Sequence, residues 1–180
     1  GLPWFVSNTD MTIPTARGVA PGNGSLVQAV ANATGATPTV AGKPEAALFR
    51  ETLDRFGADR PLMVGDRLDT DIDGAIGVGI DTLAVLTGVN DLQDVMDTAV
   101  GHRPSFVSYD LTSLNEVHKP VEFDGATARS GGATATIVDG ALRVDSDLRS
   151  TSSIRATVGL AWLLADRSGK RVKLDGTMTT

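Results

Sequence analysis

The feature that most constrains the fold of this chain is a short apolar run, residues 62–64, that leads directly into Gly65 and Asp66. The run reads Leu-Met-Val and does not alternate with polar residues, which is typical of a strand buried on both faces in a parallel sheet. In open α/β sheets, ligands bind at the carboxyl ends of the strands. We therefore expect a parallel α/β sheet with a functional site where this strand ends.

Strand-like and helix-like segments alternate over the first 90 residues or so. Residues 14–23 are rich in Pro and Gly and predict a loop. Gly35 and Gly57 stand where helix C-caps are expected. The alternation indicates an open α/β sheet with right-handed crossovers. The predicted strands cover residues 4–7, 39–41, 62–64 and 82–86, and the predicted helices cover residues 23–33, 44–56 and 71–78. The inward face of the second helix is predicted to consist of Ala47, Leu48, Leu53 and Phe56.

The pattern changes near residue 118. Residues 134–138 and 141–144, joined through Asp139 and Gly140, predict a β-hairpin. Residues 151–165 then predict an amphipathic helix, followed by a last strand at 171–174. We expect residues 1–117 to form a portion of an α/β core and residues 118–180 a small α+β extension of unknown role.

Composition narrows the classes of function. The net charge is -6, which argues against nucleic acid as a partner, because phosphate backbones bind basic surfaces. No apolar run approaches the ~18 residues that span a bilayer, so we expect no membrane partner. The chain has no cysteine, which excludes disulfides and thiolate metal sites and fits a cytoplasmic protein.

The loop after the buried strand carries three carboxylates within six residues: Asp66, Asp69 and Asp71. Such a cluster repels itself unless a cation compensates it. Mg²⁺ takes one or two carboxylates, keeps several waters and accepts a phosphate oxygen. Asp66 is the best direct ligand because it leaves the strand first. The alternative is that the acidic loop merely caps a helix N-terminus.

Two more polar groups follow predicted strands. Lys43 comes after the strand at 39–41, and its compact charge suits contact with a phosphate or the orientation of a carboxylate nucleophile. Asn8 and Asp10 follow the first strand. The alternative for Lys43 is an ordinary surface lysine.

Two stretches in this order resemble motifs III and IV of the haloacid dehalogenase (HAD) phosphatases. They are residues 41–44 (Ala-Gly-Lys-Pro) and 64–72 (Val-Gly-Asp-Arg-Leu-Asp-Thr-Asp-Ile), and the likeness is to the NagD-like, C2-capped subfamily. The resemblance covers residues 4 to about 117 and implies a partial HAD-type Rossmannoid parallel sheet. It also implies a magnesium-dependent hydrolase of a small sugar or glycerol phosphate, with a homodimer through the cap as a further expectation.

The resemblance assigns roles to individual residues. Lys43 would position the nucleophile and stabilise an aspartyl-phosphate, and would contact the substrate together with Asn8 and Asp10. Asp66 would bind the magnesium, and Asp71 would be the second acid near the metal. The resemblance therefore gives Lys43, Asp66 and Asp71 as catalytic, and Asp66 and Asp71 as the metal residues.

The chain departs from the family in one respect. The Asp-x-Asp-Gly-Thr motif, whose first aspartate attacks phosphorus, is not found in it. We therefore expect the C-terminal part of such an enzyme, without its nucleophile and cap and inactive alone. A non-catalytic module that binds a phosphorylated ligand or a protein partner is the alternative, and phosphotransferase or mutase chemistry is a third. Arg149, Arg155 and Arg167 are interpreted as a solvated face, with an anion or partner contact as the alternative.

Overall fold

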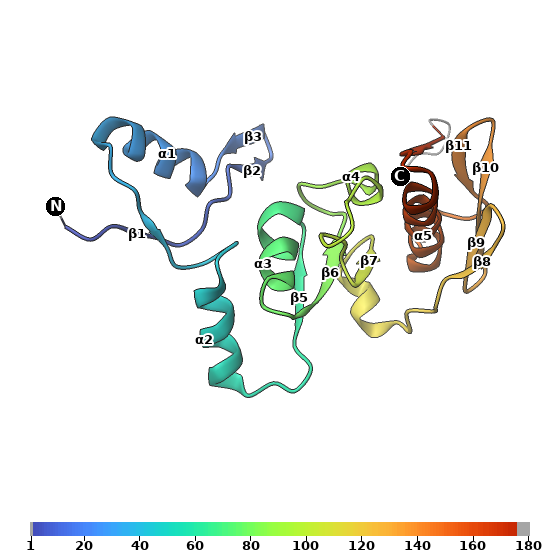
Figure 1. The fold of residues 1–180 in the computed structure, drawn as a ribbon, viewed down its shortest axis with the longest axis horizontal. Helices are drawn as coiled ribbons and strands as arrows, with labels where there is room; N and C mark the ends of the chain where they lie inside the picture. The colour runs from blue at the N-terminus through green and yellow to red at the C-terminus, as the bar shows by residue number, and fades with distance from the viewer. Residues whose placement is uncertain (1, 176–180) are drawn as a thin grey trace.

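The computed structural model describes residues 2–175, which fold into an N-terminal segment, a central parallel sheet and a C-terminal, mostly antiparallel sheet covered by a long helix (Figure 1). None of its described helices is long and apolar enough to cross a membrane. Parallel pairing of the strands predicted within the first 90 residues is confirmed, although a hairpin that was not predicted there pairs antiparallel. The fold class is therefore the predicted mixed α/β class, although these strands divide between two sheets.

The N-terminal segment contains a short parallel pair, a hairpin and a helix. Gly35 ends the helix in the left-handed conformation, as predicted. The prediction of a loop over residues 14–23 was wrong, because most of that stretch forms the hairpin. Its two prolines occupy a two-stranded ribbon, where an N–H can be spared more easily than in a central strand. The elements are β1 (Phe5–Val6), β2 (Thr12–Thr15), β3 (Gly18–Pro21), α1 (Asn23–Thr34) and β4 (Thr39–Val40).

The central sheet has the order β5-β6-β7, with all strands parallel. Its middle strand is buried from Thr82 to Val85. Full burial of the apolar run at 62–64 was a wrong prediction, because β5 pairs on one side only within the described chain and Leu62 stays 41% exposed. The strands are β5 (Leu62–Gly65), β6 (Asp81–Val85) and β7 (Phe106–Ser108).

The helices around this sheet are short, apart from the one that precedes it. A π-helical turn (Leu68–Ile72) leads into α3 (Asp73–Ile76), in place of the single helix predicted for residues 71–78. The inward face predicted for α2 was also wrong: no residue of this helix is buried, and Phe56 is 76% exposed. The other helices here are α2 (Ala46–Phe56), α4 (Leu92–Met96) and a 3₁₀ helix (Leu111–Asn115).

The C-terminal part is a five-stranded sheet of order β12-β11-β10-β9-β8 packed on the helix α5 (Thr151–Ser168). The predicted hairpin is confirmed: Asp139 and Gly140 both adopt positive φ, as a two-residue turn between twisted strands requires. The helix is capped by Ser150 and ends at Gly169. The strands are β8 (Glu122–Asp124), β9 (Thr127–Ser130), β10 (Ala133–Val138), β11 (Ala141–Val144) and β12 (Lys173–Leu174).

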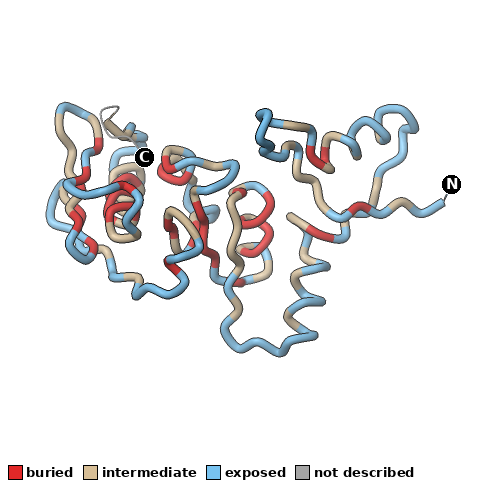
Figure 2. The backbone as a smooth tube through the Cα atoms, turned by 180° about the vertical axis from the view of Figure 1, so that it is seen from behind, coloured by how far each residue is buried: buried red, intermediate tan, exposed pale blue. Residues whose placement is uncertain are grey.

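One hydrophobic core joins the central and C-terminal parts. It contains Val95 and Val107 from the α/β part and Leu142, Ile154 and Leu160 from the C-terminal part. The helix α5 packs on β9 and β10 with one face and on α4 and β7 with another. Buried residues accordingly concentrate in these two parts, whereas the N-terminal segment is mostly exposed (Figure 2). The domain boundary predicted between residues 117 and 118 remains a prediction, and one hydrophobic core contains residues from both sides of it.

Candidate active site

The ends of β1 and β4 bring two of the predicted polar groups together. The two strands are parallel, so Asn8–Asp10 and Lys43 leave at the same edge. The backbone N–H of Thr9 donates to the carbonyl of Lys43 at 3.1 Å. A side chain at position 42 would collide with the carbonyl of Ser7, so only glycine permits this approach of the two strand ends.

The acidic loop after β5 winds into the π-helical turn and buries Asp71. This carboxylate is 4% exposed, and its Oδ2 accepts a hydrogen bond from the backbone N–H of Arg67 at 3.1 Å. It also packs against the α-carbon of Gly65, where a side chain would displace it. The loop therefore fixes the orientation of Asp71 from within its own turn.

Lys43 and Asp71 form the central ion pair of the site. Lys43 Nζ lies 2.6 Å from Asp71 Oδ1 and 3.6 Å from Asp10 Oδ2. Burial of Lys43 lowers the pKa of its ammonium group, but the hydrogen bond and charge of Asp71, assisted by Asp10, outweigh burial, and the net pKa is raised. Lys43 thus stays protonated and is held by two carboxylates from two different segments.

Arg67 is a second cation, which the sequence prediction did not place among the site residues. Its guanidinium is almost buried, and it binds Asp69 through Nη2 at 2.8 Å and approaches Asp10 through Nε at 3.3 Å. It also donates to Thr12 Oγ1 at 3.2 Å. The hydrogen bond to Asp69 is the main reason that the pKa of Arg67 is raised. Arg67 thereby ties the acidic loop to the N-terminal hairpin.

Asp66 is held by the loop that follows β6. Its Oδ2 accepts from the backbone N–H of Val89 at 2.9 Å, and its carbonyl accepts from the N–H of Asn90 at 3.2 Å. Gly88 makes room for the carboxylate, since a Cβ there would clash with it. Asn90, which the sequence prediction also left out, accepts from the N–H of Leu68 and so connects the same two loops.

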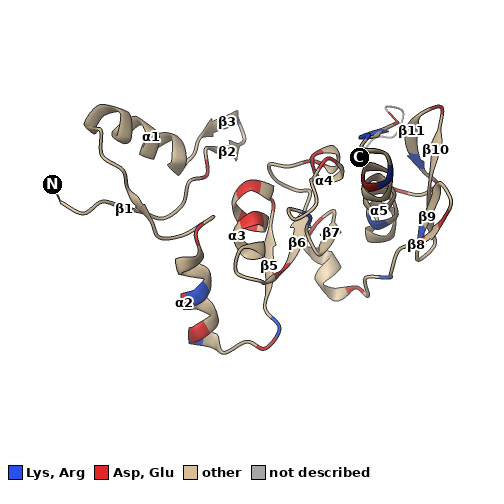
Figure 3. Cartoon of the chain, viewed as in Figure 1, with Lys and Arg blue, Asp and Glu red and all other residues tan. Residues whose placement is uncertain are grey.

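These groups border one cleft of about 270 Å³. Asn8, Asp10, Lys43, Asp66 and Arg67 all line it, so the residues proposed from sequence are gathered rather than scattered. Asp71 is buried just behind the cleft and reaches it through Lys43. Lys43, Asp66 and Asp71 therefore lie close together at one edge of the molecule's strands. Figure 3 shows acidic residues on and beside α3, next to the end of β5.

The residues present fit a magnesium ion only in part. No group of three or more Asp, Glu, His or Cys side chains is assembled for a metal within residues 2–175. Both oxygens of Asp71 already have partners, Lys43 and the N–H of Arg67, whereas among the described residues Asp66 engages only Oδ2 in a hydrogen bond. Asp66 therefore fits as a direct ligand of a cation that keeps most of its waters, and Asp71 fits as a neighbour that acts through them.

A comparison with known families agrees with this combination of parallel strands and strand-end polar groups. Residues 40–114 match the family model of HAD-hydrolase-like proteins. This part of the chain is therefore similar to the HAD-like hydrolases.

Two phosphatases have sequences similar to that of this chain. The chain is 41% identical over 170 residues to the D-glycerol 3-phosphate phosphatase of Mycobacterium tuberculosis, covering 90% of this chain and 47% of that protein. It is 39% identical over 124 residues to the acid sugar phosphatase of Staphylococcus aureus, covering 68% of this chain and 46% of that protein. The chain thus spans about half the length of the curated relatives it matches.

Solved structures agree with this likeness. The crystal structure of the M. tuberculosis glycerol phosphate phosphatase in complex with magnesium matches at a TM-score of 0.68 and 39% identity, over 89% of this chain and 48% of that one. The p-nitrophenyl phosphatase of Archaeoglobus fulgidus matches at 0.54 and 32%, over 64% of this chain and 46% of that one. The predicted HAD resemblance is confirmed.

Proposed function

We propose that this chain is the lysine- and acid-bearing part of a magnesium-dependent phosphomonoester hydrolase. The main support for this proposal is that Lys43, which is ion-paired with Asp71 at 2.6 Å, lines the same cleft as Asp66. A fixed ammonium group beside a carboxylate with an uncommitted oxygen suits a phosphoryl group bound next to a divalent cation. The substrate would be a small phosphorylated metabolite such as glycerol phosphate or a sugar phosphate, as the names of the relatives suggest.

The residues that line the cleft would have different roles in this reaction. Asp66 holds the magnesium, which when bound neutralises charge on the phosphoryl oxygens. Lys43 is kept protonated by Asp71 and Asp10, and contacts the phosphate and the nucleophile. Asn8 completes the phosphate side of the cleft. The nucleophile would be an aspartate of a segment outside these 180 residues, and it would form an aspartyl-phosphate that water then hydrolyses.

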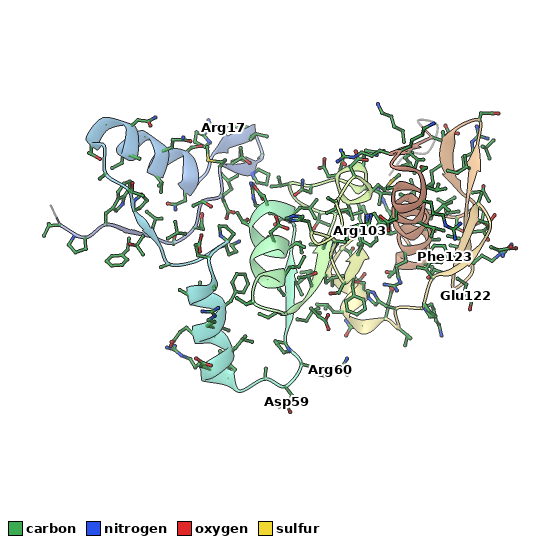
Figure 4. The ribbon with its side chains drawn as sticks, in the orientation of Figure 1. Arg17, Asp59, Arg60, Arg103, Glu122 and Phe123 are labelled. Carbon is green, nitrogen blue, oxygen red and sulfur yellow. The ribbon has the colours of Figure 1, made fainter. Side chains whose placement is uncertain are left out.

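The test compares phosphate release by two proteins. The 180-residue chain and a version extended at its N-terminus are incubated with glycerol phosphate and Mg²⁺. We expect release only from the extended protein, and loss of release in its Lys43→Met and Asp66→Asn variants. Matched controls are Arg60→Met and Asp59→Asn, two exposed residues outside the cleft that should leave the rate unchanged (Figure 4). Phosphate release by the 180-residue chain alone would contradict the expectation that the nucleophile lies outside these residues.

Magnesium binding gives a readout that does not depend on catalysis. Calorimetric titration of the 180-residue chain should show weak binding that Asp66→Asn abolishes and Asp59→Asn leaves intact. A non-catalytic module is the second candidate, because no Asp-x-Asp-Gly-Thr motif occurs in these residues. That candidate predicts no turnover by the extended protein, with binding of a phosphorylated ligand retained.

A further inference from the structure

We propose that a second pocket, at the junction between β7 and α5, binds a small organic anion with an apolar body, and that Arg155 is its anion-binding residue. The pocket has a volume of about 340 Å³ and shares no lining residue with the cleft around Lys43. This volume lies within the range of small-molecule sites in proteins. The proposal does not depend on the phosphatase activity proposed above.

The walls of the pocket are apolar and come from both parts of the chain. Val107 of β7 forms one side, Val121 and Phe123 form another, and Trp162 of α5 closes it. Gly159 lets the segment before β8 approach the helix, since a Cβ there would stand 3.0 Å from a methyl carbon of Val121. Figure 4 shows Arg103 and Phe123 on either side of the junction.

Two arginines enter this apolar pocket, and their partners differ. Arg103 is satisfied: it binds both carboxylate oxygens of Asp166, at 2.7 and 2.8 Å, and lies over the ring of Trp162. Arg155 donates only its Nε, to the carbonyl of Lys119 at 2.8 Å. Within residues 2–175 no carboxylate pairs with Arg155, and neither of its terminal nitrogens makes a hydrogen bond.

Arg155 is partly buried beside an aromatic ring. Its guanidinium lies 5.8 Å from the ring centre of Phe106, and its burial lowers the pKa of the group with no acidic neighbour to offset the effect. A half-buried cation without a counter-ion is stabilised by an anion that supplies two acceptor oxygens in its plane. Arg155 is thus partly buried rather than fully solvated, which leaves open the alternative of an anion or partner contact, whereas Arg149 is exposed as expected.

The chemistry of the occupant follows from these two features. An anionic head with at least two oxygens, such as a carboxylate, sulfonate or phosphate, matches the free fork of Arg155. A flat apolar body matches the walls formed by Val107, Val121 and Phe123. An inorganic anion alone would leave the apolar walls exposed to water and should bind weakly.

The test uses nitrogen-15 NMR of the 180-residue chain, in which the two indole N–H signals report on different places. The Nε1–H of Trp162 donates to the carbonyl of Val95 beside the pocket, and Trp4 lies in the N-terminal segment as an internal control. The probe is naphthalene-2-sulfonate, and naphthalene-2-sulfonamide is its neutral match. We expect a saturable shift of the Trp162 signal alone, with the sulfonamide weaker by ~10-fold or more, the size of a charge-assisted hydrogen bond.

Variants separate the arginine from general effects of charge. Arg155→Met keeps the apolar stem and should weaken the sulfonate ~10-fold or more. Arg155→Lys keeps the charge without the two parallel N–H donors, so its affinity for the sulfonate should lie between those of the unchanged chain and Arg155→Met. It also provides a second variant should Arg155→Met not fold. Arg149→Met makes the same charge change outside the pocket and should leave the affinity within ~2-fold, because screening weakens distant exposed charges. Equal binding of sulfonate and sulfonamide, full affinity in Arg155→Met, or no shift of Trp162 would each overturn the proposal.

Discussion

The pair of Lys43 and Asp71 should contribute far more to stability than an exposed pair of the same geometry. Replacing Lys43 by Met leaves the carboxylate of Asp71, which is 4% exposed, with only a backbone N–H as its partner. Breaking a fully buried pair in this way costs about 3–5 kcal/mol. Because the Lys43 side chain is 32% exposed, water replaces part of what is lost, and we expect about 2 kcal/mol.

A double-mutant cycle isolates this interaction from other effects of each substitution. Lys43→Met, Asp71→Asn and the double variant should give a coupling energy of about 1.5–2 kcal/mol. The matched control is the pair of Glu51 and Arg55, which has a nitrogen–oxygen distance of 2.7 Å but side chains 61% and 69% exposed. A helical pair of this kind should couple by about 0.3–0.5 kcal/mol.

Urea unfolding measured at neutral pH provides the assay. With a slope of about 2 kcal/mol per molar urea, Lys43→Met should lower the midpoint by about 1 M. The pH dependence has a definite sign: the folded-state pKa of Lys43 is raised above 10.5, so its contribution is complete below that pH and is lost as the pH rises through the folded-state pKa. A coupling energy below about 0.5 kcal/mol, no larger than that of Glu51 and Arg55, would refute the reasoning.

Three further outcomes are expected. Gly88→Ala should push the Asp66 carboxylate from its position and weaken magnesium binding ~10-fold in calorimetry, the cost of a misplaced ligand. Arg103 holds the pKa of Asp166 below its usual value, so this pair contributes stability above about pH 4 that is lost as the pH falls through the folded-state pKa. In Asp166→Asn the free energy of unfolding should therefore decrease less steeply as the pH is lowered through this range. Ser150→Ala removes the N-cap of α5 and should cost about 1 kcal/mol in thermal unfolding.

Local signals predicted the secondary structure where neighbours in sequence decide it. Gly35 and Gly57 end their helices in the left-handed conformation as expected, and the turn at Asp139 and Gly140 forms the expected hairpin. The hairpin of β2 and β3 was missed because its Pro and Gly residues suggest a loop. Whether such a stretch pairs with itself depends on backbone hydrogen bonds that composition does not reveal.

The site was predictable to the extent that strand ends meet at one edge of a sheet. That rule placed Asn8, Asp10, Lys43 and the acidic loop at strand ends, and the structure brings them to one cleft. The role of Arg67 could not be predicted from it, because its contact with Thr12 requires the unexpected hairpin. Residues 55 positions apart in the chain carry no local signal of their contact.

The charge balance of the cleft links its geometry to the proposed cation. Four carboxylates lie in or beside it, Asp10, Asp66, Asp69 and Asp71, and two cations, Lys43 and Arg67, pair with them. The deficit is two positive charges, which one divalent ion would supply. Lys43 and Arg67 neutralise Asp71 and Asp69 most directly, at 2.6 and 2.8 Å, so the uncompensated charge falls on Asp66 and Asp10. A cation bound at Asp66 would therefore complete the balance on the side of the cleft where Lys43 can hold a phosphate.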